Sequence, residues 1–196
     1  MRVTAVESSP MLTVIHLNGP INSGKSSVGR ALAGLLPGAV FIDGDDHDAP
    51  DDAPLSTRIQ VAMRRIETQI AEATGDFLVV AYPLDQANYD QLRAASEKRG
   101  ARLLVLTLAP PLEVALSDRG GRRLTPGERE RIIEMYEEGY QARAFSDAVL
   151  DTAGLTPEQS AKQAAEVVLT IRLFRRMPFM EGSSTQQTCT WTINTR

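Results

Sequence analysis

The sequence is poor in cysteine, in long apolar runs and in excess positive charge, and each shortage excludes a class of protein. Cys189 is the single cysteine among 196 residues, so no disulfide can form within the chain and a reducing cytoplasm is the expected compartment. No apolar run reaches the roughly 18 residues that a membrane span requires, and residues 1–10 carry no apolar core typical of a signal peptide. The formal net charge of −4 argues against duplex nucleic acid, which requires a dense basic face. We therefore expect a soluble, cytoplasmic monomer or homodimer that binds neither nucleic acid nor membrane.

The residues that are abundant alternate between short apolar runs and helical patterns. Aliphatic and β-branched runs predict five buried strands, at 11–18, 39–42, 77–82, 102–108 and 148–152. Apolar residues at helical spacing predict helices over 25–36, 55–73, 86–98, 111–118, 125–144 and 156–176. This alternation predicts an α/β fold, in which a five-stranded parallel sheet carries helices on both faces and binds ligands beyond the carboxyl ends of its strands.

The chain divides into one domain and two flanking segments. Residues 11–176 hold all the predicted elements, so they form the expected domain. Residues 1–10 form a loose leader, and 177–196 form a polar tail without a clear period. We expect this tail to be mobile or a non-native appendage, and we assign no role to Cys189 within it.

The stretch GPINSGKSS follows the first predicted strand and opens the first predicted helix. It matches the pattern G-x-x-x-x-G-K-[ST], in which glycines let backbone N–H groups turn toward phosphate oxygens at the start of a helix. Lys25 would then reach the β- and γ-phosphates of a nucleotide, and the Ser26 hydroxyl would hold Mg²⁺. The predicted nucleotide-binding residues are Gly19, Asn22, Ser23, Gly24, Lys25, Ser26 and Ser27.

Acidic residues follow the second predicted strand, in the stretch FIDGDDH. Asp43 and Asp45 stand there, and they lie beside the phosphate-binding loop if the first two strands are neighbours in the sheet. One carboxylate can organise Mg²⁺ through water, and the other can accept the proton of an attacking hydroxyl.

The order of strand, G-x-x-x-x-G-K-S, helix and F-x-D-x-D resembles the small-molecule kinases of the shikimate kinase and gluconate kinase group. The D-G-D of FIDGDDH is also similar to that of gluconate and adenylylsulfate kinases. The layout agrees over about residues 12–173, and only the phosphate loop and the D-x-D are close in letters. The resemblance implies a three-layer P-loop kinase fold with MgATP as phosphoryl donor. It also implies Asp43 as the carboxylate on the Mg²⁺ side, and Asp45 as the acceptor-side carboxylate and general base.

The segment SDRGGRRLTP follows the fourth strand and a short helix, at the place where such kinases carry an arginine-bearing lid. Its RGGR is similar to the RGDR of chloramphenicol phosphotransferases, and LDTAGLTPEQSA resembles their closing segment. The resemblance implies a lid around 119–126 whose Arg119 and Arg122 close over ATP and neutralise charge in the transition state. We expect Arg123 to face solvent.

The residues expected near the acceptor point to two different kinds of acceptor. The third strand ends in AYPL where shikimate kinases have a run of glycines, which makes shikimate itself a doubtful acceptor. The aspartates of residues 43–52 favour a neutral or cationic acceptor, whereas Arg58 stands where kinases of this group hold an acceptor carboxylate. The predicted acceptor-side residues are Asp45, His47, Arg58 and Tyr82. His16, inside the first strand, is expected to be a core residue.

The sequence therefore predicts an enzyme, an ATP-dependent phosphotransferase that acts on a hydroxyl of a small molecule. The acceptor is a sugar, an amino sugar, an antibiotic-like alcohol or a shikimate- or gluconate-like acid. The chain has no Asn-Lys-x-Asp tetrapeptide, which argues against a GTPase, and the preference for ATP over GTP rests on the resemblance. The alternatives are a nucleoside or nucleotide kinase and a non-catalytic nucleotide-binding regulator.

Overall fold

One parallel sheet organises the chain. The structure is a computed structural model and describes residues 11–50, 52–119, 121–174 and 191–192. The strands lie in the order β2-β3-β1-β4-β5-β6, and every neighbouring pair is parallel. They are β1 (Thr13–Asn18), β2 (Ala39–Asp43), β3 (Phe77–Ala81), β4 (Arg102–Leu108), β5 (Ala148–Leu150) and β6 (Trp191–Thr192). The five predicted strands are confirmed, and the two-residue β6, which pairs with β5, was not predicted.

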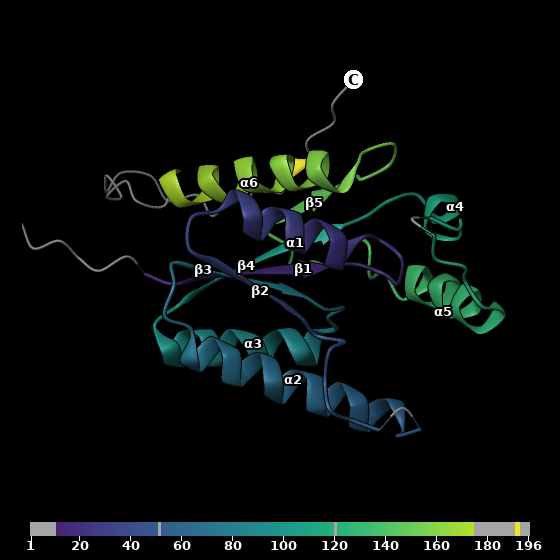
Figure 1. Ribbon diagram of the computed structural model, residues 1–196, viewed down its shortest axis with the longest axis horizontal. Coiled ribbons are helices and arrows are strands. Elements are labelled where there is room, and N and C mark those ends of the chain that lie inside the picture. The colour runs from purple at the N-terminus through teal and green to yellow at the C-terminus, as the bar shows by residue number, and fades with distance from the viewer. Residues whose placement is uncertain (1–10, 51, 120, 175–190, 193–196) are drawn as a thin grey trace, which may run out of the picture.

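Helices cover both faces of the sheet (Figure 1). They are α1 (Lys25–Leu35), α2 (Leu55–Glu72), α3 (Gln86–Arg99), α4 (Leu112–Ala115), α5 (Pro126–Glu137) and α6 (Pro157–Phe174). The helices α1 and α6 pack on one face, and α2 and α3 pack on the other. This arrangement confirms the predicted three-layer α/β fold. Among the described residues, no helix has the length and apolar character needed to cross a membrane.

The central strand β1 is buried along its whole length, which explains why its sequence TVIHLN lacks the regular alternation of apolar and polar residues. Ile15 and Leu17 face the α1–α6 side, and Val14 faces the α2–α3 side. His16 is also fully buried, and its Nε2 lies 2.7 Å from the carbonyl oxygen of Tyr82. Burial lowers the pKa of His16 to about 4, so the imidazole is neutral and donates this hydrogen bond. The expectation of a core histidine is confirmed.

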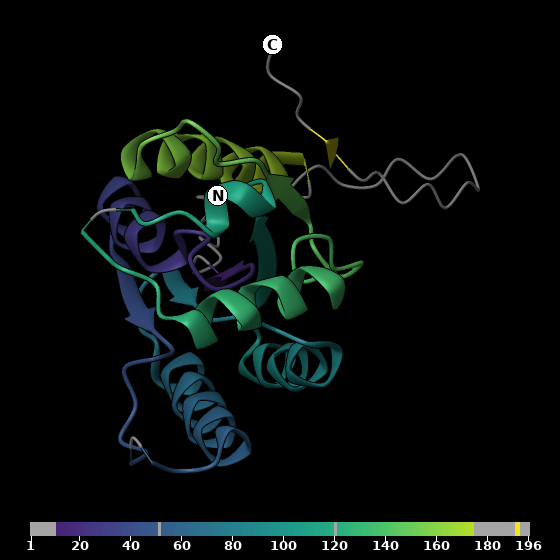
Figure 2. The same ribbon diagram turned by 90° about the vertical axis from the view of Figure 1, so that its right-hand side faces the viewer.

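Two helices, α4 and α5, lie beyond the end of the sheet that carries the loop between β1 and α1 (Figure 1 and Figure 2). The start of α5 agrees with the prediction, because Thr125 and Glu128 form a reciprocal capping box. Its end was predicted wrongly: α5 stops at Glu137, seven residues before the predicted end near 144, because Gly139 turns the chain with φ of +77°. Residues 177–190 and 193–196 of the predicted tail, with Cys189, lie outside the described residues.

Candidate active site

The loop between β1 and α1 has the backbone of a phosphate cradle. Gly19, Asn22 and Gly24 have φ of +140°, +60° and +96°, so the chain turns through the left-handed region three times. A Cβ at Gly19 would lie 2.4 Å from the carbonyl oxygen of Leu108, so no larger residue fits there. Within the described structure, no side chain caps the start of α1. The first N–H groups of this helix are therefore left for an anion.

Lys25 at the start of α1 is folded back onto the loop. Its Nζ donates to the carbonyl oxygens of Gly19, at 3.1 Å, and Pro20, at 2.7 Å. Burial lowers the pKa of Lys25 to about 8, while the carboxylates of Asp45 and, to a smaller extent, Asp43 raise it. Phosphate oxygens in the loop would offer this ammonium group stronger partners than two neutral carbonyls.

A cavity of about 830 Å³ opens beside the loop. Of the predicted site residues, those that line it are Asn22, Ser23, Gly24, Lys25, Ser26, Ser27, Asp45, Arg58, Tyr82, Arg119 and Arg122. The structure therefore brings together residues from the predicted phosphate loop, the predicted base Asp45, the two predicted lid arginines and two predicted acceptor-side residues. Gly19, Asp43 and His47 are the predicted residues that do not line this cavity.

The position of Asp43 follows from the order of the strands. The strand β3 lies between β2 and β1, so the ends of the first two strands are not neighbours. The prediction that Asp43 and Asp45 lie beside the phosphate loop required these two strands to be neighbours, and this condition is not met. Asp43 pairs in register with Ala81 of β3, and its carboxylate lies 3.7 Å from the guanidinium of Arg30. Asp45, two residues further along, is exposed and reaches the cavity. Both carboxylates act electrostatically on Lys25, so the acidic segment lies on the loop's side of the molecule.

The side chain of His47 forms a hydrogen bond within its own loop. It is half-buried, and its Nδ1 accepts a hydrogen bond from the backbone N–H of Ala49 at 3.2 Å. Tyr82 is buried at the end of β3, and burial together with Asp45 raises its pKa to about 12. Tyr82 is therefore a neutral hydrogen-bonding group in the cavity wall.

The lid arginines have partners in this structure. Arg119 donates from NH2 to the carbonyl oxygen of Asn22 at 2.5 Å, and Arg122 forms an ion pair with Glu128. Arg123 is exposed, as predicted. An apolar contact also joins the loop between β1 and α1 to the predicted lid region, because Ile21 packs against a cluster formed by Ala115, Leu124 and Ile132.

Several cavity residues were missed because they come from segments far apart in the sequence. Asp85 caps the start of α3 by accepting from the N–H of Asn88 at 2.8 Å, and it also lines the cavity. Its position after a strand is the one signal that could have suggested it. Arg131 of α5 lines the same wall and pairs with Glu134 and Glu138. Others missed are Glu128, Met135 and Tyr140.

Asn18 at the end of β1 was missed as well, and it organises this edge of the sheet. Its buried amide donates to Thr107, at 2.9 Å, and to the carbonyl of Tyr140, at 3.3 Å. The side-chain oxygen accepts from the N–H of Leu84 at 2.9 Å. One side chain therefore joins the ends of β1 and β4 to the segments after β3 and α5.

Comparison with known proteins places this fold. No family model matches the sequence, and no curated protein matches it. Solved structures do: the tunicamycin resistance protein of Deinococcus radiodurans is 26% identical with a TM-score of 0.56, and the match covers 80% of this chain and 95% of that one. A gluconokinase from Sinorhizobium meliloti is 20% identical with a TM-score of 0.67, over 85% and 97% of the two chains. A shikimate kinase from Acinetobacter baumannii is 19% identical with a TM-score of 0.58, over 84% and 97%. The chain has the fold of the P-loop small-molecule kinases.

Proposed function

We propose that the protein is an ATP-dependent phosphotransferase that transfers the γ-phosphoryl group to a hydroxyl of a small molecule. One observation carries this proposal: a single cavity is lined by the phosphate loop, by the carboxylate of Asp45 and by the guanidinium groups of Arg119 and Arg122. Phosphoryl transfer requires positioning and charge stabilisation around these same groups. The kinases among the similar structures support the donor half of the reaction.

On the donor side, the loop N–H groups would bind the phosphates of ATP, and Lys25 would leave the carbonyls of Gly19 and Pro20 to contact them. Ser26 lines the cavity and would hold Mg²⁺ directly, whereas Asp43, which does not line it, would act on the ion only through water. The described residues contain no cluster of three or more metal-ligating side chains. This fits Mg²⁺, which takes one or two protein ligands and completes its shell with phosphates and water. When bound, the ion would offset phosphate charge.

On the acceptor side, Asp45 is the base. It is exposed to the cavity and has no ion-pair partner among the described residues, so its carboxylate is available to accept the proton of an attacking hydroxyl. Arg119 and Arg122 line the same space and would stabilise the charge that develops on the transferring group.

The lining of the cavity favours an alcohol with an apolar body. The residues Leu55, Ile59, Pro83 and Met135 and the rings of Tyr82 and Tyr140 line the same cavity as Asp45. Arg131 is neutralised by two glutamates, and Asp85 adds a second carboxylate. These two features count against a strongly anionic acceptor, although Arg58 also lines the cavity. Among the acceptors named above, these features support the antibiotic-like alcohol. The similarity to a tunicamycin resistance protein supports the same class.

The test is acceptor-dependent release of ADP from ATP over a panel of apolar alcohols, amino sugars, sugar acids and nucleosides. Asp45→Asn should bind ATP normally and lose about 10²- to 10⁴-fold in turnover, because the base is removed. Asp46→Asn is the matched control, since Asp46 is an exposed neighbour that pairs with Arg65 outside the cavity.

Equal turnover by the Asp45→Asn variant and the wild-type protein would show that Asp45 is not the general base. Turnover confined to nucleosides would favour the nucleoside kinase alternative. Binding of ATP with no acceptor-dependent ADP release over the panel would favour a nucleotide-binding regulator and count against the proposal.

A further inference from the structure

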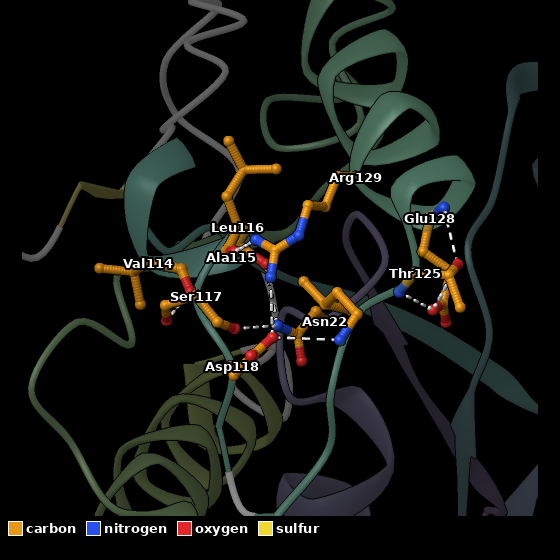
Figure 3. Close-up of polar contacts among 10 residues, drawn as sticks. Asn22, Val114, Ala115, Leu116, Ser117, Asp118, Thr125, Glu128 and Arg129 are labelled. Atoms are coloured by element: carbon orange, nitrogen blue, oxygen red, sulfur yellow. Dashed lines mark hydrogen bonds and ion pairs between the residues drawn. The ribbon is translucent and has the colours of Figure 1, made fainter.

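Asn22 joins the phosphate loop to the base of the lid, by which we mean residues 115–118 at the end of α4 and in the turn that leads into the predicted lid. Its side-chain Nδ2 donates to the carbonyl oxygens of Ala115, at 2.8 Å, and Ser117, at 3.0 Å (Figure 3). These carbonyls belong to the end of α4 and the turn after it, 93 and 95 residues away in the sequence. The two hydrogen bonds satisfy a part of the chain where a short helix ends and its carbonyls lack helical partners.

The same residue also receives a contact from the lid. Its backbone carbonyl accepts a hydrogen bond from NH2 of Arg119 at 2.5 Å. Asn22 has φ of +60°, which asparagine tolerates better than most residues, and in this conformation both its amide and its carbonyl meet the lid. The position of Arg119 at the cavity is thus tied to the backbone of the phosphate loop.

The turn after α4, which Asn22 contacts, is also held by hydrogen bonds from α5. Arg129 of α5 donates to the carbonyl oxygen of Leu116 and to Oδ1 of Asp118, the latter at 2.9 Å (Figure 3). Asp118 Oδ1 also accepts from the N–H of Leu124 at 3.0 Å. The turn after α4, the segment that leads to Leu124 and α5 are therefore linked by charged hydrogen bonds.

We propose that Asn22 is a positioning residue that couples the phosphate loop to the lid. Its amide holds the base of the lid on the loop, and this keeps Arg119 where it can meet the phosphates of a bound nucleotide. Ordering of the loop by phosphate then orders the lid, and a well-placed lid strengthens nucleotide binding in return. The coupling to nucleotide rests on the proposed function, whereas the contact between loop and lid does not.

Limited trypsin digestion tests the contact without nucleotide. Asn22→Gly keeps access to positive φ and removes the side-chain amide together with its methylene group. Cleavage after Arg119, Arg122 and Arg123 should accelerate about 5-fold or more, because the lid opens locally more often. Asn22→Asp, which puts a carboxylate against the same two carbonyls, should accelerate it further. Thr68→Ala is the control, since it removes one exposed hydrogen bond within α2. Unchanged cleavage in both Asn22 variants overturns the proposal.

A double-mutant cycle tests the coupling to nucleotide. Calorimetry gives the Kd of MgATP for the unchanged protein, Asn22→Gly, Arg119→Ala and the double variant. Asn22→Gly should weaken binding about 10-fold, and the double variant should bind no more weakly than Arg119→Ala, because Asn22 acts through Arg119. Losses that multiply in the double variant would overturn this role, even if Asn22→Gly alone were weaker.

The thermal midpoint of each variant, measured in parallel, identifies a general loss of folding. If Asn22→Gly unfolds near the assay temperature, Asn22→Ala replaces it in the cycle, because a carboxylate at position 22 would itself repel the phosphates. Absence of ATP binding by the unchanged protein would contradict the proposed function, and the trypsin digestion would still decide whether Asn22 holds the lid.

Discussion

Under the proposed function, Lys25 should make the binding of ATP depend on pH. In the free protein, burial lowers its pKa from 10.5 to about 8. Phosphate oxygens would favour the charged ammonium and raise this pKa, so binding takes up a proton above pH 8 and none below about pH 7. Affinity for ATP should therefore be highest below pH 8 and fall by up to about tenfold per pH unit above it.

Calorimetry at pH 7 and pH 9, in buffers with different ionisation enthalpies, measures this proton uptake. Lys25→Arg is the control, because arginine stays charged throughout and should show no uptake at pH 9. Equal uptake by both proteins at pH 9 would assign the proton to another group.

Glu128 combines two roles that two substitutions can separate. It accepts from the N–H of Thr125 in the capping box and pairs with Arg122 of the lid, and these contacts lower its pKa to about 2. Glu128→Gln keeps an oxygen that can accept from Thr125 but removes the negative charge that pairs with Arg122, so we expect turnover to fall about tenfold with little change in stability.

Thr125→Ala should instead affect stability and leave turnover nearly unchanged. It removes the cap while leaving the ion pair, so we expect a loss of about 1 kcal/mol in unfolding free energy with nearly unchanged turnover. Urea denaturation and steady-state kinetics of the two variants measure both quantities. The same pattern of losses in both would show that Glu128 acts only as a cap.

At the scale of elements, α1 carries the phosphate loop and must lie close to the sheet. Gly29 of α1 makes this possible: a Cβ there would come within 2.4 Å of the Phe41 ring and 3.3 Å of Leu17. Gly29→Ala should cost about 1–3 kcal/mol of unfolding free energy by overpacking. Gly34→Ala in the same helix meets no atom within 4 Å and should stabilise by up to about 1 kcal/mol. Urea denaturation measures the change in unfolding free energy for each variant. Changes of the same sign in Gly29→Ala and Gly34→Ala would contradict this packing argument.

The helices and strands that the sequence predicted well are those with strong local signals. The apolar run of β1 and the cap at Thr125 lie within a few residues of the elements they define. The predicted end of α5 was wrong because residues at helical spacing continue past Gly139, whereas the positive φ of Gly139 ends the helix before it. The phosphate loop was predictable for the same reason, since its glycines, lysine and serine are contiguous. Asp85 and Arg131 were not, because only the folded chain brings them to one wall.

At the scale of the whole molecule, the order of the strands decides which predicted residues share the site. With β3 between β2 and β1, Asp43 stays beside β3, and the turn after β2 carries Asp45 to the cavity. The spacing of two aspartates indicates chemistry, but it cannot show which strand intervenes. A sheet order depends on contacts between residues far apart in the chain, which is where reasoning from one sequence is weakest.

A cavity formed by the sheet edge on one side and the lid on the other should make nucleotide binding stabilise the whole fold. Ligand at about 100 times its Kd adds about 2.7 kcal/mol of stability, which for a chain of this size corresponds to a Tm increase of about 5–10 °C. Differential scanning fluorimetry with MgATP measures it. Adenosine should give little shift because it lacks the phosphates that the loop binds, and Lys25→Ala should lose most of the shift with MgATP. An equal shift with adenosine and ATP would mean that the loop is not the main binding element, and the function proposed from it would fail with it.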